Sequence, residues 1–189
     1  MTPKNIIILY GLPGAGKSSL AQYIGENCPG YYFADVASHP RFGHELMYQC
    51  VIDLYNDHGR GRHLVTEGVL RTPEIRNRFA HRIYKALSPT RPMTFRMPRL
   101  VFVDERSATL SSRRPSRKVA AYEEMMTDFV VGSGKYPHGV LPGDAVKTLQ
   151  ERADWVIQGF GRMRPDDLEA APTANALNLR NGAELASQG

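Results

Sequence analysis

The stretch Gly11–Ser18 reads GLPGAGKS and directly follows a run of apolar residues, Asn5–Tyr10 (NIIILY). It matches the pattern G-x-x-x-x-G-K-[ST] at every fixed position, after a predicted strand and before a segment that can form a helix. Glycines let the backbone curl so that successive N–H groups point into one hollow, and this hollow and the helix N-terminus attract phosphate oxygens. We interpret the stretch as a phosphate-binding loop (P-loop). The alternative is a glycine-rich turn in which Lys17 and Ser18 are incidental.

A P-loop gives its residues separate roles. Lys17 is expected to reach the β- and γ-phosphates of ATP, and Ser18 to supply a hydroxyl ligand to Mg²⁺. The predicted ATP contacts are Gly11, Pro13, Gly14, Ala15, Gly16, Lys17, Ser18 and Ser19. ATP and Mg²⁺ are therefore the expected cofactors.

The rest of the chain alternates short apolar runs with segments of helical periodicity. Further strands are predicted at Tyr31–Ala34, His63–Thr66, Leu100–Val103 and Asp154–Ile157. Helices are predicted at Lys17–Glu26, Arg41–Asn56, Pro73–Leu87, from near Ser107, at Ser116–Val131 and at Asp144–Arg152. Two segments with several prolines or glycines, Ser88–Pro98 and Gly132–Gly143, are predicted loops. This alternation predicts an α/β fold with a five-stranded, mainly parallel sheet and helices on both faces.

Length and composition indicate one ordinary globular domain. The chain has 189 residues, of which 42% are hydrophobic and 23% charged. Its two cysteines, Cys28 and Cys50, suit a reducing cytoplasm, and no apolar run approaches the roughly 20 residues that cross a bilayer. We expect a cytoplasmic protein without membrane contact, with a domain over residues 1–164 and a loosely packed tail over 165–189.

Positive charge is concentrated in the middle of the chain. Between Arg60 and Lys118 there are 15 Lys and Arg residues but 4 Asp and Glu, a net charge of +11, whereas the remainder carries −6. Two interpretations stay open: solvated helix faces, or a surface that meets the phosphates of a nucleic acid.

Two acids follow predicted strands. Asp35 follows the second strand and Glu67 the third. Ligands of parallel α/β sheets bind at the carboxyl ends of the strands, so both carboxylates should face the acceptor. One can accept the proton of an acceptor hydroxyl and the other can hold a Mg²⁺-bound water; we favour Asp35 as the base. Otherwise Asp35 caps the segment after it, and Glu67 pairs with Arg71.

Arginines supply the remaining candidates. The stretch Ser111–Lys118 (SSRRPSRK) is predicted to be an Arg-rich lid, in which Arg113 and Arg114 stabilise a transferring phosphoryl group; the alternative is a solvated basic loop. Arg41 and Arg71 are candidates for binding the acceptor, and Arg41 is equally compatible with a surface role. The chain also lacks an N-K-x-D-like segment that would select guanine. These features favour a small kinase over a GTPase or a motor.

Four segments resemble the small P-loop kinases of the polynucleotide kinase and zeta-toxin type, most closely the polynucleotide kinase domains of phages. The segments are GLPGAGKSS at the P-loop, CPGYYFAD before and at Asp35, VTEGVLRTPEIR around Glu67, and SSRRPSRK at the lid. The resemblance spans roughly Lys4–Val131. It implies a P-loop kinase fold and transfer of the γ-phosphoryl group of ATP to a hydroxyl.

The chain also departs from that family. Asp35 stands about two positions earlier than the family's catalytic Asp, and Glu67 replaces the third-strand Asp. The resemblance implies a nucleic acid as acceptor, DNA in the first place: either a 5′-hydroxyl end or, as in related phage kinases that modify DNA, the hydroxymethyl group of a modified pyrimidine. A small molecule, nucleoside or nucleotide is the alternative acceptor, and a nucleotide-binding regulator without phosphotransfer is the second alternative. The oligomeric state stays open.

Overall fold

The computed structural model describes residues 3–36, 46–88, 95–105, 107–113, 119–127, 129–132, 135–143 and 146–158. Its sheet has five strands: β1 (Ile6–Tyr10), β2 (Tyr31–Phe33), β3 (His63–Gly68), β4 (Arg99–Asp104) and β5 (His138–Pro142). They lie in the order β2-β3-β1-β4-β5, and every neighbouring pair is parallel. The carboxyl ends of all five strands therefore meet at one edge, which we call the carboxyl edge. The α/β fold that the sequence predicts is confirmed.

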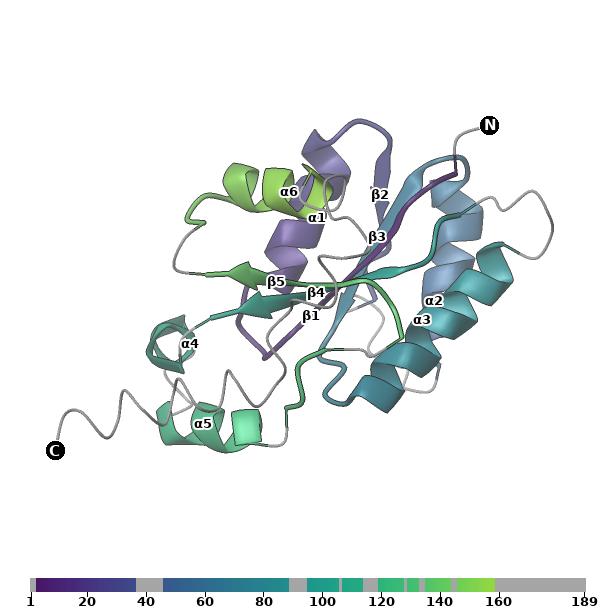
Figure 1. Ribbon diagram of the computed structural model, residues 1–189. Helices are drawn as coiled ribbons and strands as arrows, with labels where there is room; N and C mark the ends of the chain where they lie inside the picture. Colours follow the sequence, from purple (N-terminus) through teal and green to yellow (C-terminus); the bar gives the residue numbers. More distant parts are fainter. Residues whose placement is uncertain are drawn as a thin grey trace, which may run out of the picture.

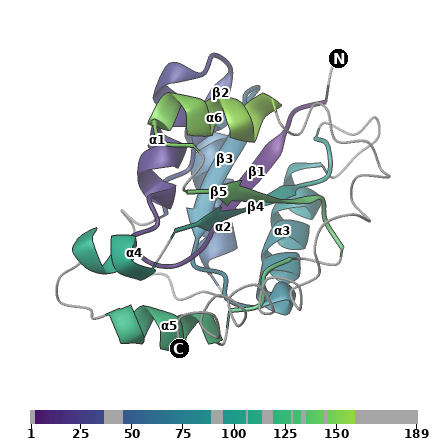
Figure 2. The ribbon, with the colours of Figure 1, turned by 60° about the vertical axis from the view of Figure 1, so that its left-hand side comes forward.

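Helices cover both faces of this sheet. They are α1 (Lys17–Asn27), α2 (Met47–Leu54), the single-turn π-helix η1 (Tyr55–Gly59), α3 (Pro73–Leu87), α4 (Ser107–Arg113), α5 (Val119–Thr127) and α6 (Leu149–Gln158). Helices α1 and α6 pack together on one face, and α2 and α3 pack together on the other (Figures 1 and 2). Helices α4 and α5 lie beyond the carboxyl ends of β4 and β5 (Figure 1).

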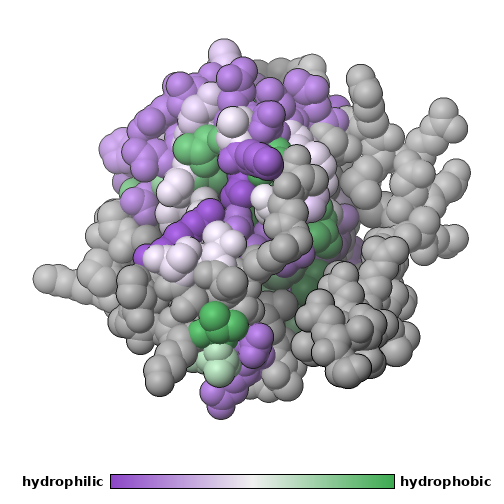
Figure 3. Space-filling view, turned by 90° about the vertical axis from the view of Figure 1, so that its left-hand side faces the viewer, coloured by the Kyte–Doolittle hydropathy of each residue, from purple (hydrophilic) through white to green (hydrophobic). Residues whose placement is uncertain are grey.

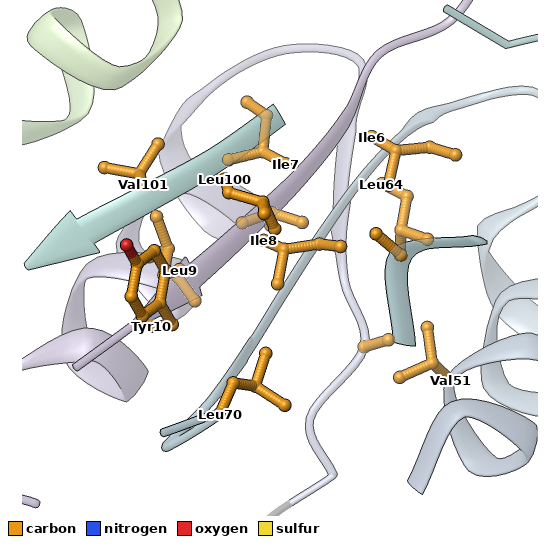
Figure 4. Close-up of a cluster of buried hydrophobic side chains, with 14 of the residues drawn as sticks. Ile6, Ile7, Ile8, Leu9, Tyr10, Val51, Leu64, Leu70, Leu100 and Val101 are labelled. Carbon is orange, nitrogen blue, oxygen red and sulfur yellow. The ribbon is translucent and has the colours of Figure 1, made fainter. Parts of the chain in front are cut away.

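Strand β1 forms the centre of the core. All five of its residues are buried, because helices cover both faces of the sheet at this strand. The close-up in Figure 4 shows its side chains alternating between the two faces, where they meet Leu64, Leu100 and Val101 of the flanking strands. Burial of each isoleucine or leucine contributes about 1.5–3 kcal/mol relative to an exposed position. Strand β1 is therefore a stable anchor for the segment Gly11–Ser18 that follows it.

The fifth strand lies elsewhere than predicted. Asp154–Ile157 was expected to be a strand but belongs to helix α6, whose buried Arg152, Ala153 and Val156 recur at helical spacing. Strand β5 instead occupies His138–Pro142, inside the predicted loop Gly132–Gly143. In β5 buried residues alternate with less buried ones, but a run of five residues that includes Gly139 and Pro142 gives a weak strand signal. Of the predicted short helix Asp144–Arg152, the described residues 146–148 are not helical, and Leu149–Arg152 form the start of α6.

Other elements agree more closely with expectation. Helix α3 spans Pro73–Leu87 as predicted, with Pro73 in the first turn and the Thr72 hydroxyl accepting a hydrogen bond from the Ile75 N–H. Of the predicted helix Ser116–Val131, α5 covers Val119–Thr127, and the described residues 129–131 are not helical. Of the predicted helix Arg41–Asn56, the described part begins at Met47 and is continued by η1 to Gly59. The expected tail over 165–189 lies outside the described residues.

Within the described part of the chain, no helix combines the length and apolarity needed to span a bilayer. Helices α1 and α6 present mostly hydrophilic residues outward, in the upper part of the surface in Figure 3. The outer surface of this helix pair is therefore solvated.

A buried arginine joins α3 to the segment that follows α5. Arg76 is fully buried, and its guanidinium donates hydrogen bonds to the carbonyls of Leu70 (2.7 Å), Gly132 (2.5 and 3.0 Å) and Val130. It also lies 4.3 Å from the ring centroid of Tyr10. Removal of its side chain would leave the buried Leu70 carbonyl and the part-buried carbonyls of Val130 and Gly132 without this donor, so this contact is costly to break.

The hydroxyl of Tyr10 extends this network to strand β5. It accepts a hydrogen bond from the Gly132 N–H (3.0 Å) and lies 2.5 Å from Nε2 of His138. Burial raises the pKa of Tyr10 to about 12 and lowers the pKa of His138 to about 4, the charge of Arg76 adding to the latter shift. Near neutral pH the phenol is therefore protonated and donates to a neutral imidazole, which links β1 to β5.

The neutral imidazole predicts acid-dependent stability. Because the folded-state pKa of His138 lies near 4, below the ordinary 6.5, the unfolded chain binds the proton first, and stability present above pH 6.5 is lost as the pH falls toward 4. Relative to His138→Gln, which does not titrate, the wild type should lose about 2 kcal/mol of unfolding free energy between pH 7 and pH 5. Urea unfolding at several pH values measures this difference. His81→Gln, on the exposed face of α3, is the control, and parallel pH profiles for wild type and His138→Gln would contradict the assignment.

Candidate active site

The P-loop connects the carboxyl end of β1 to the first turn of α1. Gly14 and Gly16 have φ values of 89° and 87°, which residues with side chains rarely adopt, and the Ala15 N–H donates to the Leu12 carbonyl (3.2 Å). At Gly11 a Cβ atom would lie 2.8 Å from the carbonyl oxygen of Val103. The turn therefore needs glycine both for backbone conformation and for close approach to β4. The N-terminus of α1 opens at this loop, as an anion site requires.

Lys17, Ser18 and Glu67 come together at the carboxyl edge. The Lys17 ammonium donates to the Leu12 carbonyl (2.9 Å) and lies 4.0 Å from Oε2 of Glu67. The Ser18 hydroxyl donates to Oε1 of the same carboxylate (3.1 Å). Strand β3 brings Glu67 here because it is the immediate neighbour of β1, with Leu9 opposite Glu67 in the register. The structure thus places two predicted P-loop residues against one of the two predicted acids.

This pair of oxygen ligands fits Mg²⁺. A serine hydroxyl and a carboxylate oxygen are hard donors, and Mg²⁺ is held in phosphate-binding sites by one or two such groups together with waters and substrate phosphates. In the described residues no group of three or more His, Cys, Asp or Glu side chains forms a cage for a metal. Ser18 and Glu67 are accordingly the residues that would hold the ion, and the remaining ligands would come from the nucleotide and water.

Asp35 lies on the neighbouring strand end. It follows β2, whose continuation is fixed by hydrogen bonds from the Thr66 hydroxyl to the Ala34 carbonyl (3.2 Å) and from the Ala34 N–H to the Val65 carbonyl (3.0 Å). The side chain is half-buried, and its charge contributes to raising the pKa of Cys50. Asp35 and Glu67 therefore stand at the carboxyl ends of adjacent parallel strands, as their predicted role requires.

Arg113 reaches the P-loop from helix α4. Its guanidinium donates to the Gly14 carbonyl (3.1 Å) and lies 3.6 Å from the Glu105 carboxylate. Glu105 in turn accepts a hydrogen bond from Arg152 of α6 (2.6 Å). The predicted lid arginine therefore lies at the loop that is expected to hold the phosphates.

Of the three remaining predicted arginines, the structure describes only Arg71. Arg71 is exposed and lies four residues beyond Glu67, in the turn before α3. Leu70 in this turn has φ 41°, an unusual value for a residue with a side chain, and its carbonyl is held by Arg76. Arg41 and Arg114 lie outside the described residues.

Sequence reasoning missed Glu105 and Arg152. Both are largely buried, and Arg152 also donates to the Val146 carbonyl (2.8 Å). A Cβ atom at Gly16 would lie 3.8 Å from a guanidinium nitrogen of each of Arg113 and Arg152, so two positive groups flank the P-loop. The available signal was the helical spacing of Ala153 and Val156, which puts Arg152 on the buried face of α6. The predicted strand at Asp154–Ile157 hid that signal.

Comparison with known proteins bears on the fold. No protein-family model and no curated sequence gives a significant match. Among solved structures, the chain is similar to a gluconokinase from Sinorhizobium meliloti 1021, with TM-score 0.58, 14% identity, and coverage of 91% of this chain and 100% of that one. It is also similar to the tunicamycin resistance protein of Deinococcus radiodurans (TM-score 0.58, 14% identity, 85% and 97% covered) and to the APS kinase of Mycobacterium tuberculosis (TM-score 0.51, 18% identity, 85% and 99% covered). The chain thus has the P-loop kinase fold.

The contact between Glu67 and Ser18 predicts a magnesium-dependent effect. Glu67→Gln keeps the shape of the side chain but removes the charge, so the gain in ATP affinity that Mg²⁺ confers should fall roughly tenfold or more. Calorimetric titration with ATP, with and without Mg²⁺, measures this gain without knowledge of the acceptor. Glu26→Gln on α1, whose carboxylate accepts from Gln22, is the matched control. An unchanged gain in the Glu67 variant would remove this residue from the metal site.

The position of Arg113 predicts a catalytic effect larger than a binding effect. Arg113→Ala should lower kcat by roughly 10²-fold while changing the ATP KM much less, because charge on the transferring group is greatest in the transition state. Steady-state kinetics at saturating acceptor separate the two constants, with the exposed Arg60→Ala as the comparison. A rise in KM at constant kcat would indicate that Arg113 merely binds the nucleotide.

Proposed function

We propose that the protein is an ATP-dependent kinase that transfers the γ-phosphoryl group of ATP to a hydroxyl on a nucleic acid. The acceptor is either a hydroxymethylated pyrimidine base in DNA or a polynucleotide 5′-hydroxyl end, and DNA is favoured. The observation that supports phosphotransfer is the contact of the Glu67 carboxylate with the Ser18 hydroxyl beside Lys17, at the carboxyl edge next to Asp35. The reaction would take place in the cytoplasm.

In this mechanism Glu67 and Asp35 have different roles. Glu67 is already engaged with Ser18 and Lys17, so its role is to hold the metal side of the site. Asp35, on the adjacent strand end, accepts the proton of the acceptor hydroxyl as the oxygen attacks the γ-phosphorus, and the bond to the bridging oxygen of ADP breaks. Bound Mg²⁺ supplies neutralisation of the phosphate charge.

Positive side chains supply the remaining stabilisation. In this proposal Lys17, which donates to the Leu12 carbonyl, meets the β- and γ-phosphates, and Arg113, which donates to the Gly14 carbonyl, stabilises the transferring group. Arg152 donates a hydrogen bond to the Glu105 carboxylate (2.6 Å), which fixes the guanidinium of Arg152 beside the P-loop. Preorganised charges of this kind act on the transition state without further reorganisation.

A nucleic acid acceptor is supported by charge. The segment Arg60–Lys118 has a net charge of +11 in a chain whose remainder is acidic, and it includes the strand that presents Glu67. Binding through phosphates makes activity fall steeply with salt concentration. A target base within a duplex would have to be extruded, at a cost of a few kcal/mol.

A small-molecule kinase is the second candidate. It is favoured by the similarity of the fold to a gluconokinase and an APS kinase, whose names denote kinases of small molecules. In that case the arginines near the P-loop serve only the nucleotide, and activity depends little on salt. A nucleotide-binding regulator is the third, and it would not turn over ATP with any acceptor.

A phosphate-transfer panel tests the proposal. Label from γ-labelled ATP should appear on hydroxymethyluracil-containing DNA or on DNA or RNA with 5′-hydroxyl ends, and not on nucleosides, nucleoside monophosphates or gluconate. Transfer should weaken between low and high salt. Lys17→Ala should abolish transfer, because the ammonium is expected to reach the phosphates, while the protein stays folded, because the core is formed by the apolar residues of β1 and its neighbours.

Each other outcome has a meaning. Label on a small molecule alone would establish the second candidate, and no transfer to any acceptor, with Asp35→Asn and Glu67→Gln leaving all measured properties unchanged, would establish the third. Full activity of Lys17→Ala would remove the P-loop from the mechanism.

A further inference from the structure

Helix α3 has two faces of different character. Its buried face consists of Arg76, Phe79, Ala80, Ile83 and Leu87. The opposite face exposes Arg78, Arg82 and Lys85, whose spacing of four and three residues places them on one side of the helix. A row of like charges on a helix destabilises it slightly when no anion is present.

This row starts at the candidate active site. Exposed Arg71 precedes the helix and lies four residues beyond Glu67. The first turns of α3 cannot drift away from the site, because Arg76 binds the Leu70 carbonyl and lies against the ring of Tyr10, the residue before the P-loop. From Pro73 to Lys85 the helix runs about 18 Å away from the carboxyl edge, at 1.5 Å per residue.

Arg82 is held in place by a neighbouring ring before any anion binds. The guanidinium of Arg82 lies 4.5 Å from the ring centroid of Tyr48, on the neighbouring helix α2. This contact restricts the arginine without neutralising it, so less conformational entropy is lost when Arg82 binds an anion.

Nearby carboxylates leave the row positive. Glu74 is exposed in the first turn of α3, where its backbone and Thr72 lower its pKa, so it caps the helix. Asp53 of α2 accepts a hydrogen bond from Gln49 of its own helix. Neither carboxylate is within ion-pair distance of the three basic residues in the described part of the chain.

We propose that Arg71, Arg78, Arg82 and Lys85 form a track on α3, the α3 track, that binds the backbone phosphates of a single-stranded nucleic acid and leads the strand to the carboxyl edge. A straight row of exposed cations that ends beside a phosphotransfer site is complementary to a linear polyanion. The inference rests on the proposed function for its acceptor, but it assigns a binding surface that can be measured without catalysis.

Direct binding tests the track. The variant Arg78→Gln/Arg82→Gln/Lys85→Gln is compared with Arg60→Gln/Arg96→Gln/Lys147→Gln, which removes the same charge from exposed positions elsewhere. Fluorescence anisotropy of a labelled single-stranded DNA, without ATP, should show at least roughly tenfold weaker binding by the track variant at low salt. Its logarithmic salt dependence should be shallower by about 2, since each lost phosphate contact removes about 0.7. The comparison variant should bind within about twofold of wild type. Equal losses in both variants, or none in the track variant, would overturn the proposal.

Two further measurements establish that a loss of DNA binding belongs to the track itself. Unchanged thermal unfolding and unchanged ATP KM of the track variant show that the loss does not come from damage to the fold or the P-loop. Vesicles with and without phosphatidylserine test a membrane surface, and charge-dependent vesicle binding with no binding of DNA would overturn the nucleic acid assignment. If DNA binding depends on the track while only a small molecule is phosphorylated, the proposed function fails and the track stands.

Discussion

The backbone of Gly11 passes so close to the carbonyl of Val103 that a single Cβ atom would lie 2.8 Å from that oxygen. This approach locks the end of β1 against β4 at the point where the P-loop begins. On the other side of β1, the register with β3 sets Glu67 opposite Leu9, and the carboxylate meets the Ser18 hydroxyl. Beyond β4, Glu105 joins Arg113 and Arg152. The site is therefore a consequence of strand order, in which β1 lies between β3, which carries Glu67, and β4, which Glu105 directly follows.

Much of this arrangement was predictable from local signals. The P-loop pattern, the apolar β1 and the proline-led α3 each contain their information within a few residues. The strand and the helix are confirmed, and the P-loop segment lies between β1 and α1 as predicted. The last strand was predicted at Asp154–Ile157, which belongs to helix α6. From a short apolar run like this one, the buried face of a helix cannot be told from a strand. Pairing with β4 determines that His138–Pro142 is a strand, and such pairing is not visible in a five-residue window.

The part of the candidate site that follows from strand topology alone was predictable from the sequence. Asp35 and Glu67 stand at adjacent strand ends because parallel strands end at one edge. The contacts of Arg152 with Glu105 and of Arg76 with Gly132 were not foreseen, since they join residues 47 and 56 positions apart in the sequence. Charged residues are ordinarily read as surface residues, whereas Arg76 and Arg152 lie inside and are satisfied by carbonyls or a carboxylate.

These two buried arginines also anchor the chain on either side of α4 and α5. Before α4, Glu105 is tied to α6 by Arg152, and after α5, Gly132 is tied to α3 by Arg76. Gly132 has φ 108°, a backbone conformation that favours glycine, and its N–H and carbonyl are bound by Tyr10 and Arg76. The described residues of α4 and α5 therefore lie between two anchored points of the chain. Arg113 contacts the P-loop from α4, a helix that follows Glu105 and precedes Gly132.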